Sequence, residues 1–160
     1  MSNQTPEQAL LQFLVGTWTY EFATAATSEY PGVTATGTET VRRIGETWVL
    51  IENQGVSSDK SASHSVTTLG VSVETGRFIG TVAGTAVPST LFIYDGGIGA
   101  QGSAIHLETT GPAITPGNRT DRYRDVMQFL GADARETIAQ LLDKDGEWVE
   151  FMRTRYRRAR

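Results

Sequence analysis

The sequence predicts an all-β protein whose strands close into one antiparallel up-and-down barrel of about ten strands, with a short helix capping one end. A glycine, Gly16, separates a short apolar segment from the first strand. Alternating segments then follow to the C-terminus, and the links between them are too short for crossover helices, which implies antiparallel neighbours. Closure of such a sheet removes its exposed edges and encloses an interior. A β-sandwich is the structural alternative.

The predicted helix covers residues 6–15 and places Leu10, Phe13 and Leu14 on one face. Its end coincides with a glycine, and the first strand starts directly afterwards. We therefore expect Trp18 to be buried near the closed end of the barrel, where its indole ring can fill the base.

Strands are predicted wherever apolar and polar residues alternate between turn signals. In the first half they are Thr17–Thr27, Val33–Ile44, Trp48–Val56, His64–Val73 and Arg77–Thr85. In the second half they are Thr90–Tyr94, Ala104–Thr110, Thr120–Leu130, Arg135–Leu142 and Glu147–Tyr156. A turn is expected at Asp95-Gly96-Gly97. The chain has 160 residues and shows neither a repeat nor a linker, so we predict a single domain over residues 1–160.

The charge balance argues against a nucleic-acid-binding protein, because the formal net charge is -4 and the sequence pI is about 5.2. Arginines nevertheless crowd the C-terminus, at Arg153, Arg155, Arg157, Arg158 and Arg160. We interpret them as a solvated strand face whose charges pair with carboxylates on neighbouring strands. The carboxylates expected there are Asp133, Glu136 and Glu147. Contact with an anionic ligand is the alternative.

The chain contains no Cys, which excludes disulfides, thiolate metal ligands and cysteine nucleophiles. The sequence shows neither a secretory signal pattern nor an apolar run long enough to span a membrane. We therefore expect a cytoplasmic protein without membrane insertion.

Motifs of catalysis and cofactor binding are missing from the sequence. The segment Gly97–Gly102 matches the three-glycine dinucleotide pattern, but a strand is predicted after it, so we interpret it as a hairpin loop. His106 and Glu108 share a strand face, and we expect them to point to solvent rather than to bind a metal. The sequence contains no nucleophile elbow, His-Glu-x-x-His or phosphate loop. We therefore predict no catalytic residue, no metal and no cofactor.

Alternation also gives an expected lining for the interior. Trp18, Tyr20 and Phe22 share one face of the first strand. Residues 48–51 and 91–94 are apolar on both faces, so alternation leaves open which of their side chains point inward.

Five segments carry a resemblance to known barrels. They are Phe13-Leu14-Val15-Gly16-Thr17-Trp18, Gly45-Glu46-Thr47-Trp48-Val49-Leu50-Ile51-Glu52, Leu69-Gly70, Tyr123-Arg124-Asp125-Val126 and the ending Trp148 to Arg158. In this order the chain resembles the lipocalin-like, or calycin, barrels, and within them a widespread bacterial family of domains of unknown function. The resemblance implies a barrel that holds small, mostly apolar molecules. Haem-binding relatives use a late histidine, and this chain has none after His106, so the resemblance implies no haem.

The last strand differs from that of the fatty-acid-binding relatives, which place an Arg two residues ahead of a Tyr to hold a carboxylate. Here Thr154 stands two residues ahead of Tyr156. Arg158 is the arginine that shares the phase of Tyr156, whereas Arg153 and Arg155 lie on the other face. We expect Arg158 to reach the barrel mouth and to hold an anionic head group.

The sequence thus predicts that the barrel binds a small hydrophobic or amphipathic molecule without catalysis. The residues expected at the ligand site are Tyr20, Trp48, Glu52, Phe78, Phe92, Tyr123, Met152, Tyr156 and Arg158. One alternative is an enzyme that pairs an interior carboxylate, Glu52 or Glu150, with Tyr123 or Tyr156 as acid and base. Another is a homodimeric interaction module with a filled interior.

Overall fold

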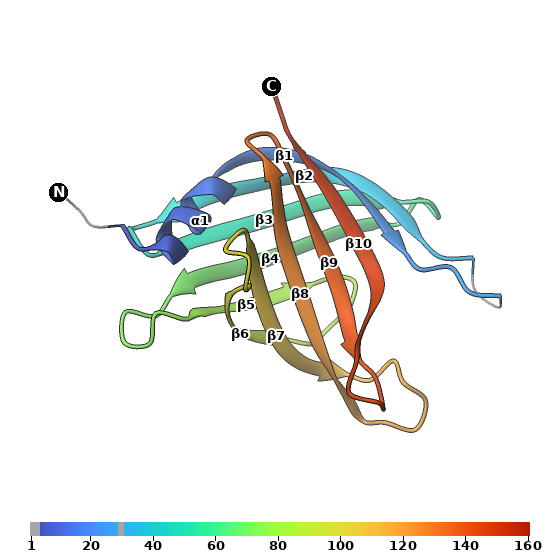
Figure 1. Ribbon diagram of the computed structural model, residues 1–160. Helices are drawn as coiled ribbons and strands as arrows, with labels where there is room; N and C mark the ends of the chain where they lie inside the picture. The colour runs from blue at the N-terminus through green and yellow to red at the C-terminus, as the bar shows by residue number, and fades with distance from the viewer. Residues whose placement is uncertain (1–3, 29–30) are drawn as a thin grey trace.

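The computed structural model describes residues 4–28 and 31–160 and confirms the predicted barrel. One helix, α1, is followed by ten strands, β1 to β10, which form a closed antiparallel ring (Figure 1). The elements are α1 Pro6–Leu14, β1 Gly16–Thr24, β2 Thr34–Ile44, β3 Trp48–Ser57, β4 Ala62–Val71, β5 Phe78–Gly84, β6 Phe92–Ile98, β7 Ala104–Pro112, β8 Thr120–Gly131, β9 Ala134–Leu142 and β10 Trp148–Arg158. Each strand pairs with its neighbours in sequence, and β1 pairs with β10, which excludes the sandwich.

Helix α1 begins where its capping residues require. Thr5 is the N-cap, and its side chain accepts a hydrogen bond from the backbone N–H of Gln8, whose side chain accepts one from the backbone of Thr5 in return. Pro6 occupies the first turn, where its missing N–H costs nothing. The helix ends before Gly16, whose φ of +133° lies in a region that favours glycine, so the predicted break is confirmed.

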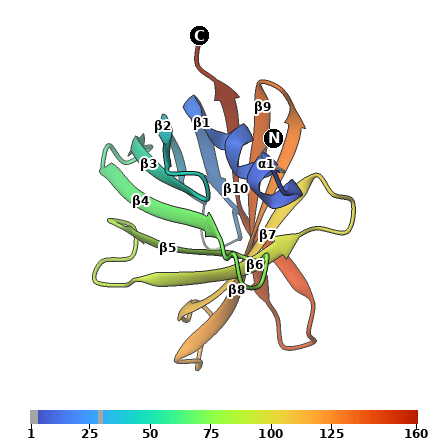
Figure 2. The same ribbon diagram turned by 90° about the vertical axis from the view of Figure 1, so that its left-hand side faces the viewer.

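Helix α1 covers one end of the barrel (Figure 2). Leu11 and Leu14 of the helix pack into the same cluster as Trp18, Leu69 and Phe78. The Trp18 side chain is 0% exposed, and its indole Nε1–H donates to the backbone carbonyl of Leu14 at 2.8 Å. The expected burial of this tryptophan at the closed end is therefore confirmed.

The predicted turn at Asp95-Gly96-Gly97 is wrong, because these residues lie inside β6. Gly96 pairs with Phe78 on one side and with Leu107 on the other. A Cβ atom at Gly96 would lie 1.9 Å from the carbonyl oxygen of His106. The glycine therefore permits close approach of two strands, a role that the sequence pattern did not distinguish from a turn.

The hairpin between β6 and β7 follows directly, and the strand β7 after it confirms that Gly97–Gly102 does not lead into a helix. In the part of the chain that the structure describes, no helix is long and apolar enough to cross a bilayer.

Candidate ligand site inside the barrel

The strand register decides which side chains face the interior. Side chains alternate between the two faces of a strand, and paired residues share a face. Seven of the nine residues predicted for the ligand site share a face with buried core residues or with each other. They are Tyr20, Phe78, Phe92, Tyr123, Met152, Tyr156 and Arg158.

Trp48 and Glu52 lie on the outer face of β3, so the expectation that they face the interior is corrected. The inward positions of this strand are Val49 and Ile51, which are 2% and 3% exposed. Trp48 covers Gly70 of β4, where a Cβ atom would lie 2.4 Å from the indole ring. Periodicity had left this strand open because both of its faces are apolar.

The inward side chains differ in how deeply they are buried. Trp18 and Phe78 are fully buried, whereas Phe22, Phe92 and Met152 keep part of their surface accessible although the register turns them inward. Their inward direction and partial exposure make these three side chains candidates for the apolar wall of a ligand site.

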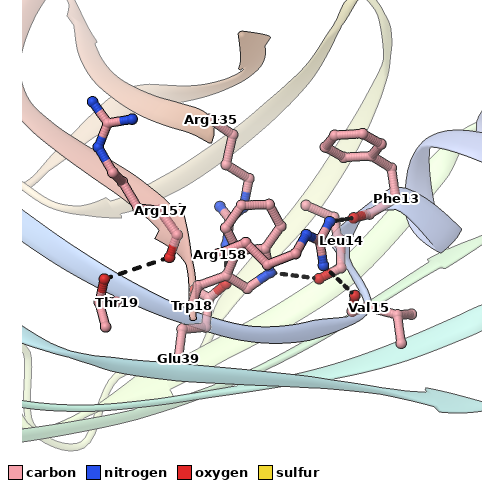
Figure 3. Close-up of polar contacts among 9 residues, drawn as sticks. All are labelled: Phe13, Leu14, Val15, Trp18, Thr19, Glu39, Arg135, Arg157 and Arg158. Atoms are coloured by element: carbon pink, nitrogen blue, oxygen red, sulfur yellow. Dashed lines mark hydrogen bonds and ion pairs between the residues drawn. The ribbon is translucent and has the colours of Figure 1, made fainter. Parts of the chain in front are cut away.

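Arg158 shares the inward phase of Tyr156, but it does not reach the lumen mouth, so its expected role is corrected. Its guanidinium donates from Nη1 to the carbonyl of Val15 at 2.9 Å and from Nη2 to that of Phe13 at 3.0 Å (Figure 3). The group also lies over the Trp18 ring, 4.2 Å from its centroid. The C-terminus of a helix leaves carbonyl groups without partners, and Arg158 satisfies two of them.

The outward phase of Arg153 and Arg155 is confirmed. Arg153 donates to Glu150 at 2.7 Å and to Glu136 at 3.0 Å, and Arg155 approaches Glu136 at 4.0 Å. These contacts also place Glu150 on the outer surface, away from the lumen.

A buried ion pair, Arg135 with Glu39, lies beside Trp18 (Figure 3). The Arg135 side chain is 1% exposed and Glu39 is 3% exposed. The guanidinium also lies between aromatic rings, 3.7 Å from the centroid of Tyr156 and 4.8 Å from that of Trp18. Burial lowers the pKa of Arg135 from its ordinary value. Sequence reasoning missed this pair, although Glu39 shares the phase of Ala35 and Val41 in a strand whose other phase is threonine-rich.

A second polar pair, which is partly buried, lies further along the lumen. The phenol O–H of Tyr94, on β6, donates to Oδ2 of Asp125, on β8. Burial raises the pKa of the Asp125 carboxyl, although the Tyr94 hydrogen bond opposes this. Burial, together with the neighbouring Asp125, raises the pKa of Tyr94 well above its ordinary value. The sequence held the signal for Asp125, which alternates in phase with Tyr123 and Met127.

Four buried polar atoms at inward positions have no hydrogen-bond partner in the described chain: Oδ1 of Asn53, Oγ1 of Thr109 and Oγ1 of Thr137, together with Nε of Arg135 in the ion pair described above. Thr109 lies two residues from Leu107, the β7 partner of Asp125. Thr137 lies two residues from Ala139, the partner on β9. Both threonines are thus diagonal neighbours of Asp125 on the same face of the sheet.

Asn53 lies across the lumen from Asp125. In a ring of ten strands β3 is opposite β8. The strands are tilted, so residues that are paired directly from one strand to the next do not stay at one height along the barrel axis but drift steadily along it. When the directly paired residues are followed from Asp125 through β7, β6, β5 and β4, the succession of pairs arrives at β3 beside Thr47. The succession of pairs that runs through β9 and β10 reaches it near Ser58. The level of Asp125 on β3 is midway between these points, where Asn53 lies.

We call Asn53, Tyr94, Thr109, Asp125 and Thr137 the lumen polar cluster. They surround one level of the lumen from four strands on one side and from β3 on the other. Buried polar atoms are almost always hydrogen-bonded in native proteins, so unpartnered atoms gathered at one level mark a place where a polar molecule fits.

The residues offer no metal site: among the described positions, no group of three or more His, Cys, Asp or Glu side chains is arranged to hold a metal ion. Glu108 pairs with Arg122 at 2.8 Å. His106 packs against Gly99 and, like Glu108, shares its strand phase with outward residues. The predicted outward direction of this pair is thereby confirmed.

Fold and interior together define the class: a closed antiparallel β-barrel with a set of polar groups enclosed in its lumen. The chain belongs to the family described as "Protein of unknown function (DUF1579)", whose profile matches residues 3–158. The predicted resemblance to a family of domains of unknown function is thus confirmed.

Solved structures support the same fold. A protein solved as Rv2717c from M. tuberculosis is 16% identical, with a TM-score of 0.66, and the match covers 99% of this chain and 100% of that one. The S-type phycobiliprotein lyase CPES from Guillardia theta is 11% identical, with a TM-score of 0.62 and coverage of 100% and 99%. The comparison with curated proteins found no match. At these identities the likeness shows the fold alone.

Proposed function

We propose that the protein binds a small amphipathic molecule in the barrel lumen, without transforming it, and that the lumen polar cluster holds the polar part of this molecule. The observation that carries the proposal is the set of unpartnered polar atoms at Asn53, Thr109 and Thr137, next to the Tyr94–Asp125 pair. Leaving such atoms buried without partners costs about 1–3 kcal/mol each, and a ligand that hydrogen-bonds to them removes this cost.

The apolar part of the ligand has a matching surface. Phe22, Phe92 and Met152 are lumen-facing side chains that remain partly accessible. A small number of polar groups among apolar walls is the usual composition of a small-molecule site. The two kinds of surface together favour an amphipathic ligand over a purely hydrophobic one.

Native mass spectrometry of the purified protein tests this proposal directly. We expect a population whose mass exceeds that of the chain by a small molecule, which is lost on denaturation. The matched variant is Thr109→Val with Thr137→Val, which keeps side-chain volume but removes two unpartnered hydroxyls. This variant should retain less of the molecule while remaining folded. A chain that carries no molecule and binds no apolar fluorescent dye would instead support the interaction module with a filled interior.

The acid–base enzyme is a second candidate because one observation favours it: a tyrosine and a carboxyl group at inward positions are in direct contact, at Tyr94 and Asp125. The residues first considered, Glu52 and Glu150, lie outside and do not serve. Incubation of the released molecule with fresh protein distinguishes the two candidates, because an enzyme would convert it and a binding protein would return it unchanged. Tyr94→Phe should abolish conversion but not binding.

A further inference from the structure

We infer that the ligand carries a protonated amine, and that Asp125 is the carboxylate that pairs with it inside the lumen. This inference rests on the proposed function and specifies the chemistry of the same site. The ligand class is an apolar body that bears an ammonium group, in contrast to the anionic head group that the arginines of the last strand had suggested.

Among residues 4–28 and 31–160, the charged groups that face the interior leave one carboxylate without a cationic partner. Among the described residues, the two arginines that reach inward each have a partner: Arg135 pairs with Glu39 through Nη2 while its Nε is left without a partner, and Arg158 donates to the carbonyls at the end of α1. Asp121, at the rim, accepts hydrogen bonds from two backbone N–H groups and from Asn118. Within the described chain, Asp125 has neither a cationic partner nor an N–H donor. Its contact is the Tyr94 hydroxyl, which occupies Oδ2 and leaves Oδ1 without a donor.

The other unpartnered atoms of the cluster also favour a donor-rich ligand. Asn53 presents its Oδ1, an acceptor, from the opposite strand, and the hydroxyls of Thr109 and Thr137 can accept as well as donate. An ammonium group has three N–H donors and no acceptor, so it can satisfy several of these atoms at once. An alcohol supplies one donor, and a carboxylate supplies none. A carboxylate would also meet Asp125 as a like charge without a free arginine to balance it.

Binding of an amine should involve the proton of Asp125. Burial raises the pKa of this carboxyl, whereas an ammonium group within contact distance would lower it again. The other titratable groups that face the interior near this level are four tyrosines, Tyr94, Tyr123, Tyr20 and Tyr156, with the Arg135–Glu39 pair beyond them toward α1. The pKa of Tyr94 is raised well above its ordinary value by burial and by the neighbouring Asp125, so Tyr94 keeps its proton near pH 7. A proton released on amine binding would therefore come from Asp125.

A matched series of probes tests the inference: 1-naphthylmethylamine, 1-naphthalenemethanol and 1-naphthoate, titrated by fluorescence at equal ionic strength. We expect the amine to bind about tenfold more tightly than the alcohol, because a charge-assisted hydrogen bond is about twice as strong as a neutral one. The carboxylate should bind most weakly. Equal or tighter binding of the alcohol or the carboxylate would overturn the inference and leave lumen binding intact. Failure of all three probes would overturn lumen binding as well.

Two variants with the same change in net charge locate the effect. Asp125→Asn should reduce amine affinity to that of the alcohol, whereas Glu52→Gln, on the outer face, should leave it unchanged. Equal losses in both would show general electrostatic attraction and overturn the inference. Tyr94→Phe, which keeps the carboxylate but removes its donor, should preserve the preference for the amine. Calorimetry of the unaltered protein is done in two buffers of different ionisation enthalpy, at a pH where Asp125 is still protonated. The heat of amine binding should differ between the two buffers, which shows proton release, whereas the heat of alcohol binding should not. Equal heats of amine binding in the two buffers would contradict the pairing.

Discussion

Arg158, near the end of the last strand, donates from Nη1 to the backbone carbonyl of Val15 at 2.9 Å, at the point where the first helix ends. The same guanidinium donates to the carbonyl of Phe13 at 3.0 Å and lies over the Phe13 ring, 5.6 Å from its centroid. A cation at a helix C-terminus also complements the helix dipole. The end of the chain therefore holds its beginning in place over the closed end of the barrel.

Arg158→Ala should loosen α1 from the barrel. The variant leaves two helix-end carbonyls without their charged donor, so we expect a loss of about 1–3 kcal/mol in the free energy of unfolding. Hydrogen exchange of the amides in α1 should become faster, with little change in β4 to β7. Arg157→Ala is the control, because that side chain points outward, and it should change stability by less than about 0.5 kcal/mol. Unaltered exchange in α1 would contradict the role of Arg158.

Trp18→Ala should cost about 3–5 kcal/mol in denaturant unfolding, because it removes a large, fully buried side chain from the closed end. Trp18→Phe should cost less, since it keeps the ring but leaves the Leu14 carbonyl without the indole donor. A cost below about 1 kcal/mol for the alanine variant would indicate that the tryptophan adds little to the core.

The architecture could be predicted from the sequence because each element carries its own local signal. The helix has an apolar face and a glycine stop at Gly16, and the strands are short segments, most of them with a period of two, between turn residues. The turn prediction at residues 95–97 is wrong because glycine occurs both in turns and in strands whose backbones approach closely. Gly96 lies within a strand because two backbones approach closely there, and local sequence gives no sign of that neighbour.

The interior could be predicted only in part. Strands with one polar face, such as β1, revealed their inward residues, whereas β3 did not, so Trp48 and Glu52 were placed on the wrong side. The polar groups of the lumen were missed for a different reason: Tyr94 and Asp125 lie 31 positions apart and meet only after the barrel closes. Long-range register, which local patterns do not contain, decides such contacts.

The outward direction of Trp48 gives a further test. Trp48→Ala should leave the affinity of a lumen-bound apolar dye unchanged, because the indole covers Gly70 on the outside. Phe92→Ala should weaken the same dye, since its ring faces the lumen and lies over Gly111. Both variants are checked for folding by circular dichroism before titration. A loss of dye binding confined to Trp48→Ala would mean that the dye binds to the outer surface.

The Arg135–Glu39 pair should show strong coupling. Glu39→Gln leaves a buried guanidinium without its counter-charge, so we expect a loss of about 3–5 kcal/mol. Replacing both partners, Glu39→Gln with Arg135→Met, should restore most of that loss, because no uncompensated charge remains. A double-mutant cycle measured by urea unfolding gives the coupling energy. If the losses of the single variants Glu39→Gln and Arg135→Met simply add in the double variant, the pairing is contradicted.

Stability should depend on pH through Asp125 with a sign opposite to that of an ordinary surface carboxylate. Burial raises the pKa of Asp125 in the folded protein above its unfolded value of about 3.8. Its contribution to stability is therefore fully present below that value and is lost as the pH rises through the folded pKa. In the ligand-free protein, Asp125→Asn should increase the free energy of unfolding at pH 7, and this gain should disappear in acid.

Asp95 gives the contrast, because its hydrogen bond from Arg77 lowers its pKa. Its contribution to stability is therefore present at neutral pH and is lost as the pH falls through the folded pKa. Asp95→Asn should accordingly be destabilising at pH 7 and neutral in acid. Urea unfolding of both variants between pH 3 and pH 8 measures how the free energy of unfolding depends on pH. A destabilising effect of Asp125→Asn at neutral pH would show that the carboxylate is held in its charged form by a partner other than Tyr94.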